Sequence, residues 1–175
     1  LLNNRFQFKL DVGTLIYNEE TEPWFKEFKE NNECHYFNRY KEYLRRDKNF
    51  NLKAIEVLDN EVLDEIMDYL GDPRINFTPR RGLVMGDVQS GKTSTYTGLI
   101  CKAADAGYKA IIVLTGTIES LRQQTQKRLD EGFVGFDSDH MSKINEDEFW
   151  IGVGRYNKKR GVVLTSKGTD FTSNT

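Results

Sequence analysis

The chain has 175 residues with a formal net charge of -2 and 38% hydrophobic residues, which suits one domain with a hydrophobic core and excludes two large ones. The nearly balanced charge excludes a generally basic nucleic-acid-binding protein and leaves only a local basic surface open. No apolar run approaches the length of a membrane span, and the well-separated cysteines Cys34 and Cys101 argue against a zinc site or a disulfide framework, so we expect a cytoplasmic protein with no membrane partner.

Both ends of the sequence predict a piece cut from a longer protein. The chain starts at Leu1 without an initiator methionine or the shape of a signal peptide. Residues 169–175 carry neither a helix signal nor a strand signal. We therefore expect further functional parts beyond Thr175.

Residues 1–73 are predicted to form a helical N-terminal region. A capping hydroxyl followed by a first-turn proline at residues 21–23 predicts a helix start. Aromatic side chains then recur at helical spacing, with an interruption at residues 31–32. This stripe can be read as a ligand surface or as core, and its spacing favours core packing. The stripe consists of Trp24, Phe25, Phe28, Tyr36, Phe37, Tyr40, Tyr43 and Leu44.

Two more helices are predicted before residue 73. The first covers residues 52–58, and the second runs from about residue 60 to Leu70 with Asp59 as its cap. Glycine followed by Asp-Pro at residues 71–73 is predicted to stop the second helix.

Residues 74–175 are predicted to form an α/β domain. Short apolar segments with strand character alternate with two helical segments. The order strand, helix, strand, helix predicts a parallel sheet with right-handed crossovers. The predicted strands cover residues 82–85, 110–114, 149–153 and 161–164, and the predicted helices cover residues 92–106 and 119–130.

The loop after the first predicted strand matches the P-loop pattern G-x-x-x-x-G-K-[ST]. Its glycines allow backbone angles that turn N–H groups toward phosphate oxygens, and the helix that follows adds its positive dipole end. A surface turn with an incidental lysine is the alternative, but an apolar segment before the loop and a helix after it favour the P-loop. The predicted cofactor-binding residues are Gly86, Asp87, Val88, Gln89, Ser90, Gly91, Lys92, Thr93 and Ser94.

Two of these residues are predicted to carry the chemistry. The Lys92 ammonium is expected to reach the β and γ phosphates. The Thr93 hydroxyl is expected to complete the shell of Mg2+, an ion that keeps several waters and needs few protein oxygens. Lys92 and Thr93 are therefore the candidate catalytic residues, and Thr93 is the candidate metal ligand. The predicted ligand is a nucleoside triphosphate with magnesium.

A second polar group is a candidate contact for nucleic acid. Thr115 and Thr117 follow the second predicted strand, and Arg122 and Gln124 lie in the first turns of the next helix. The carboxyl edge of a parallel sheet is where ligands bind, and hydroxyls with a cationic fork suit a nucleic-acid phosphate. A solvated polar helix face is the alternative, and the chemistry of these residues leaves both open.

This arrangement resembles the first RecA-like lobe of superfamily-two helicases. Their first motif is the P-loop, and their next motif touches the nucleic-acid backbone through a Leu and a Gln three residues apart. Leu121 and Gln124 keep that spacing, whereas Thr117-Ile118 stands where the family has Pro-Thr. The resemblance implies a partial RecA-like parallel sheet, truncated at its C-terminal end and preceded by the helical region.

A closer resemblance is to the Z-one domain family of endonuclease-type proteins that are found with such helicase modules. The resemblance implies that the nucleotide is ATP and that the full-length protein acts on DNA in restriction-like or phage-defence systems. The segments that carry it are residues 71–73, 81–93, 98–108, 111–114 and 121–132.

An acidic motif for ATP hydrolysis is not found at its expected place. Helicase-type ATPases need Asp-Glu at the end of a strand to hold magnesium and orient the attacking water. Residues 145–148 are acidic but precede a predicted strand, and Asp130-Glu131 ends a helix. We therefore expect the motif beyond Thr175, and we expect these residues to bind ATP with little turnover. Paired carboxylates of a nuclease site are not evident in the sequence either.

The leading hypothesis is an ATP-binding N-terminal fragment of a DNA-acting motor or nuclease-associated ATPase of the Z-one type. A P-loop regulatory switch or kinase that does not act on DNA is the alternative. A third possibility is an interaction domain with an unused P-loop. The oligomeric state stays open.

Overall fold

A computed structural model describes residues 22–75, 80–85, 91–140 and 149–168. Residues 86–90 of the predicted P-loop and the acidic turn at residues 145–148 lie outside the described residues. Within the described ranges the chain is helical, and it forms no β-strand or sheet. A single antiparallel bridge joins Phe136 to Trp150.

The predicted α/β fold with a partial RecA-like parallel sheet is therefore wrong for the described residues. Residues 80–85 and 110–114 form no regular secondary structure, and Gly152–Arg155 forms a 3-10 helix where a third strand was expected. Apolar sequence favours a strand only where a neighbouring strand supplies hydrogen bonds and both faces are covered. Here the side chains of Leu83, Leu114 and Leu164 are 82%, 91% and 93% exposed.

The N-terminal region is helical as predicted over its described residues. The first helix starts at Phe25, and its N-cap residue Trp24 makes no side-chain capping hydrogen bond. The predicted capping residue Thr21 lies outside the described residues. The predicted interruption lies close to the observed one, because the first helix ends at Asn31 and the second begins at His35. The elements are α1 (Phe25–Asn31), α2 (His35–Arg46), α3 (Leu52–Glu56), the π-helical η1 (Val57–Leu63) and α4 (Asp64–Leu70).

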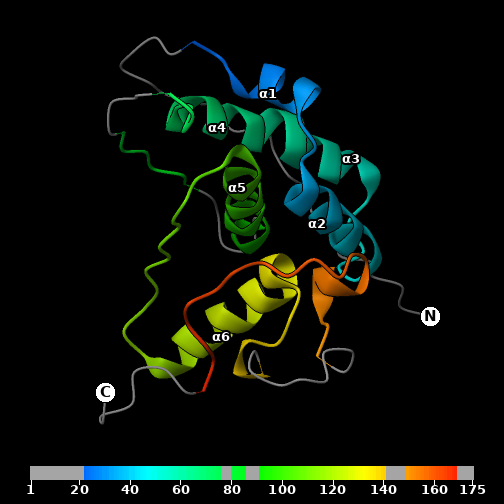
Figure 1. Ribbon diagram of the computed structural model, residues 1–175, viewed down its shortest axis with the longest axis vertical. Coiled ribbons are helices and arrows are strands. Elements are labelled where there is room, and N and C mark those ends of the chain that lie inside the picture. The colour runs from blue at the N-terminus through cyan, green and yellow to red at the C-terminus, as the bar shows by residue number, and fades with distance from the viewer. Residues whose placement is uncertain (1–21, 76–79, 86–90, 141–148, 169–175) are drawn as a thin grey trace, which may run out of the picture.

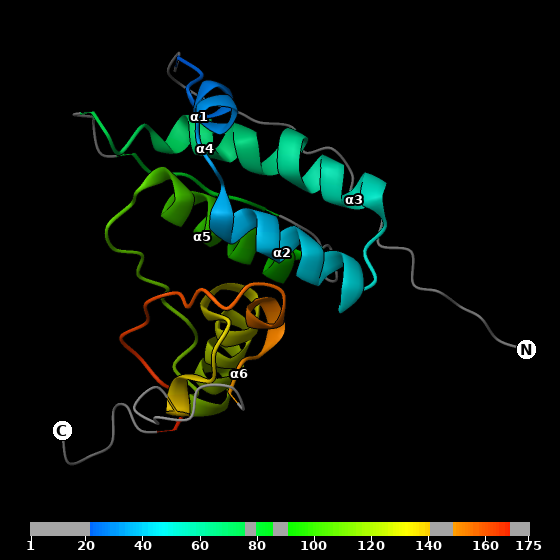
Figure 2. The same cartoon turned by 45° about the vertical axis from the view of Figure 1, so that its right-hand side comes forward.

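The last three of these elements form one helical run, seen along a common axis in Figures 1 and 2. Asn51 caps its start, because its side chain accepts a hydrogen bond from the Ala54 N–H at 2.7 Å. The predicted break at Asp59 is absent, since Asp59 lies inside the π-helical turn and turns its carboxylate toward lysines instead of capping a helix.

Helix α5 (Lys92–Ala106) lies at the centre of the molecule, between this long run and the C-terminal elements (Figure 1). It contacts α2, η1, α4 and η2, and it ends at Gly107, whose φ of 95° suits glycine. The C-terminal elements are α6 (Glu119–Leu129), the π-helical η2 (Asp130–Val134), and the 3-10 helices η3 (Ser138–His140) and η5 (Gly152–Arg155).

The predicted aromatic stripe is core, as expected. Phe25, Phe37 and Leu44 are almost fully buried, and they pack with residues of α5 such as Cys101 in one cluster. Helix α5 approaches closely at Gly98, where a Cβ would lie 2.7 Å from the Leu63 Cδ1 atom. The N-terminal helices and α5 thus share a core across the predicted domain boundary at residues 73–74, which itself stays a prediction.

A cluster of buried charges crosses this core. Lys102 of α5 is 1% exposed, and its ammonium donates to the Asp59 carboxylate at 2.5 Å and also to Asp64. Lys29 and Lys41 reach the same Asp59 carboxylate at 3.0 and 3.2 Å. Burial lowers the pKa of Lys102, and the two carboxylates oppose this shift. The cluster ties α5 to the long helical run.

None of the helices in the described residues is both long and apolar enough to cross a membrane.

Candidate nucleotide-binding site

The N-terminus of α5 begins at a glycine with a left-handed backbone angle. Gly91 precedes the helix with a φ of 79°, a left-handed angle that favours glycine. Its carbonyl accepts the Thr95 N–H at 3.1 Å, and the helix then runs for 15 residues from Lys92. The first-turn N–H groups of such a helix lack intrahelical partners and, with the helix dipole, favour an anion. The helix predicted for residues 92–106 is therefore confirmed, and the P-loop itself stays a prediction.

A cavity of about 450 Å3 lies against this helix start. It is enclosed by α2, the segment between α2 and α3, and the junction of α6 with η2. Four of the nine predicted cofactor-binding residues meet here, and the other five lie outside the described residues. The cavity is lined by Tyr40, Tyr43, Leu44, Lys48, Phe50, Gly91, Lys92, Thr93, Ser94, Thr97, Arg128, Glu131 and Gly132.

Three cationic side chains line the cavity. Lys92 is exposed at its mouth, and Arg128 reaches across from α6 to donate to the Thr93 Oγ1 at 3.3 Å. Lys48 joins them and lies 3.6 Å from the Glu131 carboxylate. The cavity is thus lined by three cationic side chains and one carboxylate, and this excess of positive charge favours an anionic ligand.

Aromatic and aliphatic side chains line the cavity as well. Tyr43, Leu44 and Phe50 are buried there. The Tyr40 hydroxyl donates to the Ser94 carbonyl at 3.2 Å, and burial raises the pKa of Tyr40, so the phenol keeps its proton. Beside it, the buried Thr97 Oγ1 makes no hydrogen bond of good geometry with the described residues. This hydroxyl is buried in the wall of the cavity.

Comparisons with protein-family models, curated proteins and solved structures find no match for this chain. The resemblance to the Z-one domain family and to helicases therefore stays a prediction.

The described residues around this cavity offer Mg2+ one protein oxygen and no cluster of metal ligands. The described residues contain no group of three or more His, Cys, Asp or Glu side chains placed to hold a metal. A nucleotide-bound Mg2+ does not need one, because phosphates and waters supply most of its ligands. The half-buried Thr93 hydroxyl can supply one oxygen, provided that the exposed Arg128 side chain moves away from it.

The predicted nucleic-acid contacts do not gather at this cavity. Thr115, Thr117 and Gln124 are exposed, and none of them lines it. Arg122 is already engaged, since its guanidinium binds Glu119 at 2.7 and 2.9 Å and the carbonyls of Ser166 and Lys167 at 2.9 and 2.8 Å. Through the last two of these hydrogen bonds Arg122 holds residues 166–167 next to α6.

Several lining residues were not singled out from the sequence. Arg128 lies in the helix predicted for residues 119–130, but its position there gave no sign that it would face Thr93. Lys48 and Phe50 follow α2 in a connection without a motif. Their approach to Lys92 depends on the packing of α2 along α5, which Figure 2 shows side by side.

Proposed function

We propose that this chain binds a nucleoside triphosphate with Mg2+ at the N-terminus of α5. The observation that supports this most strongly is the combination of a left-handed Gly91, the helix start at Lys92-Thr93 and the adjoining cavity of about 450 Å3. A volume of this size is in the range of small-molecule sites. ATP is the proposed nucleotide because of the resemblance to the Z-one family.

In this proposal the phosphates lie beside the cationic side chains of the cavity. First-turn N–H groups of α5 and the Lys92 ammonium hold the β and γ phosphates, and Arg128 adds a planar donor that suits phosphate oxygens. Thr93 supplies the protein oxygen for Mg2+, which when bound neutralises charge on the phosphates. Arg128 exchanges its contact with Thr93 Oγ1 for a phosphate oxygen.

In this proposal the nucleoside lies beside the aromatic side chains of the cavity. Tyr43 and Phe50 form a largely buried apolar wall, and the base packs against it in this proposal. The Thr97 hydroxyl and the Tyr40–Ser94 contact supply polar groups nearby. No part of this wall selects adenine over guanine by a specific hydrogen bond.

We further propose that the full-length protein acts on DNA as a helicase-like or endonuclease-associated ATPase in the cytoplasm. The exposed Thr115, Thr117 and Gln124 remain candidate contacts for a DNA backbone. Arg122 must first release Glu119 or the 166–167 carbonyls before it can bind phosphate. The two free cysteines, both buried, fit a reducing compartment.

Calorimetric titration with a non-hydrolysable ATP analogue and Mg2+ tests the nucleotide site. We expect Lys92→Ala to weaken binding by about tenfold to a hundredfold, because a hydrogen bond to a charged group contributes about 1.5–3 kcal/mol. The thermal unfolding of the variant should be unchanged, since Lys92 is exposed.

The matched control is Lys53→Ala, which removes an exposed lysine of α3 that does not line the cavity. It should bind like the wild type. Equal affinity of the Lys92→Ala variant and the wild type would refute the assignment, and so would an absence of binding by the wild type.

A further inference from the structure

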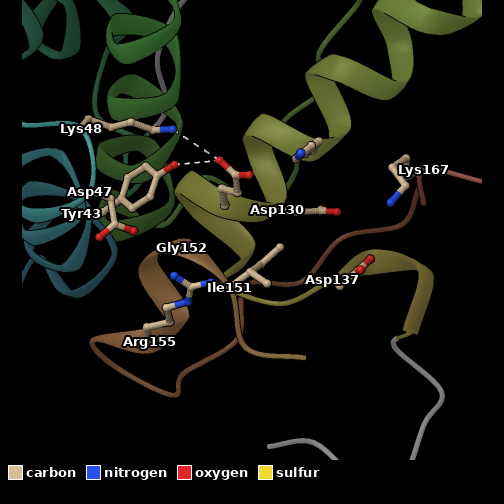
Figure 3. Close-up of a pocket in the computed structure, with 11 residues that line it drawn as sticks. Tyr43, Asp47, Lys48, Asp130, Asp137, Ile151, Gly152, Arg155 and Lys167 are labelled. Atoms are coloured by element: carbon tan, nitrogen blue, oxygen red, sulfur yellow. Dashed lines mark hydrogen bonds and ion pairs between the residues drawn. The ribbon is translucent and has the colours of Figure 1, made fainter. Parts of the chain in front are cut away.

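A second cavity, of about 400 Å3, lies on the other side of the Tyr43–Glu131 contact (Figure 3). Tyr43, Lys48 and Glu131 line both cavities and form the wall between them. The Tyr43 hydroxyl donates to Glu131 at 2.8 Å, which fixes that wall. The complete lining is Tyr43, Asp47, Lys48, Lys127, Asp130, Glu131, Asp137, Ile151, Gly152, Arg155 and Lys167.

The far side of this cavity is a closely packed backbone framework. At Gly152, whose φ is 48°, a Cβ would lie 2.6 Å from the Glu131 Cα atom, so η5 rests directly on η2. The Ile151 N–H donates to the Gly135 carbonyl at 3.1 Å and holds the two elements together. The position of Arg155 relative to η2 is therefore set by main-chain contacts.

The carboxylates of the lining are already occupied by protein donors. Asp130 accepts the Ser138 hydroxyl at 2.7 Å and the Gln126 amide at 2.9 Å. Asp47 accepts the Tyr156 hydroxyl, and Asp137 lies 3.2 Å from the His140 ring nitrogen. Burial raises the pKa of Asp130, and the hydrogen bonds from Ser138 and Gln126 oppose this shift. The acids thus do not form an open cation site.

The four basic side chains of the lining fall into two groups of two. Lys167 pairs with Asp139 at 3.2 Å, and Lys48 is shared with Glu131 and the Tyr43 ring. Lys127 and Arg155 form no ion pair or hydrogen bond with the described residues, although both line the cavity. In Figure 3 the Arg155 guanidinium points toward Ile151 and the interior of the cavity. Two cationic side chains without a partner among the described residues therefore line the same cavity.

From this arrangement we propose that the second cavity binds a phosphate group through Arg155 and Lys127. A guanidinium offers two parallel donors to phosphate oxygens, and an ammonium adds a point charge. Lys127 and Arg128 are consecutive in α6 but line different cavities, so one helix supplies a cation to each. This second site goes beyond the nucleotide-binding proposal and does not depend on it.

The phosphate has two possible sources, a free phosphate and a nucleic-acid backbone. The two probes are inorganic phosphate and a short single-stranded oligothymidylate, each titrated into the intact chain with the nucleotide site removed by Lys92→Ala. The test variant adds Arg155→Ala and Lys127→Ala to that background, and the control adds Lys53→Ala instead. All these positions are exposed, so folding should be retained and circular dichroism will verify it.

We expect at least one probe to bind, and we expect the Arg155→Ala, Lys127→Ala variant to lose at least tenfold in affinity while the control does not. Binding of the oligonucleotide alone identifies a nucleic-acid backbone, with a salt slope that falls by about one for each lost phosphate contact. Binding of inorganic phosphate identifies a free anion. If neither probe binds, or if test and control variants bind equally, the second site is ruled out whatever the result at the nucleotide site.

Discussion

Replacing Lys102 by alanine should destabilise the fold by about 3 kcal/mol or more, because removing one member of a buried ion pair leaves its partner desolvated. The Lys102 ammonium donates to Asp59 and Asp64 and lies 4.5 and 5.2 Å from the centres of the Phe37 and Phe25 rings. Alanine removes these contacts and also leaves a cavity between the rings. Urea unfolding of variant and wild type measures the loss.

The Lys102→Met variant separates the effect of the lost charge from the effect of the lost side-chain volume. Methionine fills most of the space, and Lys29 and Lys41 still neutralise Asp59, so we expect less than half of the loss seen with alanine. A loss below about 1 kcal/mol for Lys102→Ala would contradict the buried cluster as described, since broken buried pairs typically cost several times that.

The same cluster predicts how stability changes with acid. Burial favours the neutral form of Asp59, but the Lys102 ammonium and the other lysines outweigh it and lower the pKa of Asp59 to about 2 from its ordinary 3.8. A depressed folded-state pKa contributes stability that is present above the unfolded pKa and is lost as the pH falls toward the folded one. Asp59 should therefore stabilise the protein above about pH 4, and the part of this contribution due to Lys102 should vanish in Lys102→Ala.

The second large effect is expected at Gly154. A Cβ at this position would overlap the Gly135 carbonyl oxygen and lie 2.7 Å from its carbon, and both are main-chain atoms that cannot rotate away. Gly154→Ala should therefore separate η5 from η2 and destabilise the fold by about 3 kcal/mol, the upper end of overpacking effects. Urea unfolding measures this loss as well.

Gly82→Ala is the matched control, because a Cβ at Gly82 meets no atom within 4 Å. Its free energy of unfolding should stay within about 0.5 kcal/mol of the wild type. If Gly154→Ala were as stable as Gly82→Ala, the packing of η5 on η2 and the frame of the second cavity would be wrong.

The helical N-terminal region was predictable because the residues that specify each helix are close together in the sequence. The aromatic residues from Phe25 to Leu44 repeat at 3.6-residue spacing, and burying that face is enough to place the helices. Helix α5 was equally local, since Gly91 and Gly107 mark its two ends with left-handed angles. The Asp59 error arose because a capping residue and a buried ion-pair partner look alike in sequence.

The sheet was not predictable in the same way, because a strand depends on a partner elsewhere in the chain. The apolar runs at residues 82–85 and 110–114 have the composition of buried strands, yet they are exposed and unpaired. The cavity residues Lys48 and Arg128 were missed for a related reason. They meet α5 only through long-range packing, and neither belongs to a motif of fixed spacing.

The most direct test of nucleotide binding at α5 follows the backbone amide signals of Gly91, Lys92, Thr93 and Ser94 by nuclear magnetic resonance. A non-hydrolysable ATP analogue with Mg2+ is titrated into the isotope-labelled protein. We predict that these four amides shift together along one saturable curve, because their N–H groups face the phosphates, while the amide of Lys53 on α3 stays unchanged. Binding that leaves the four amides unperturbed, or no binding at all, would contradict a nucleotide site at the start of α5.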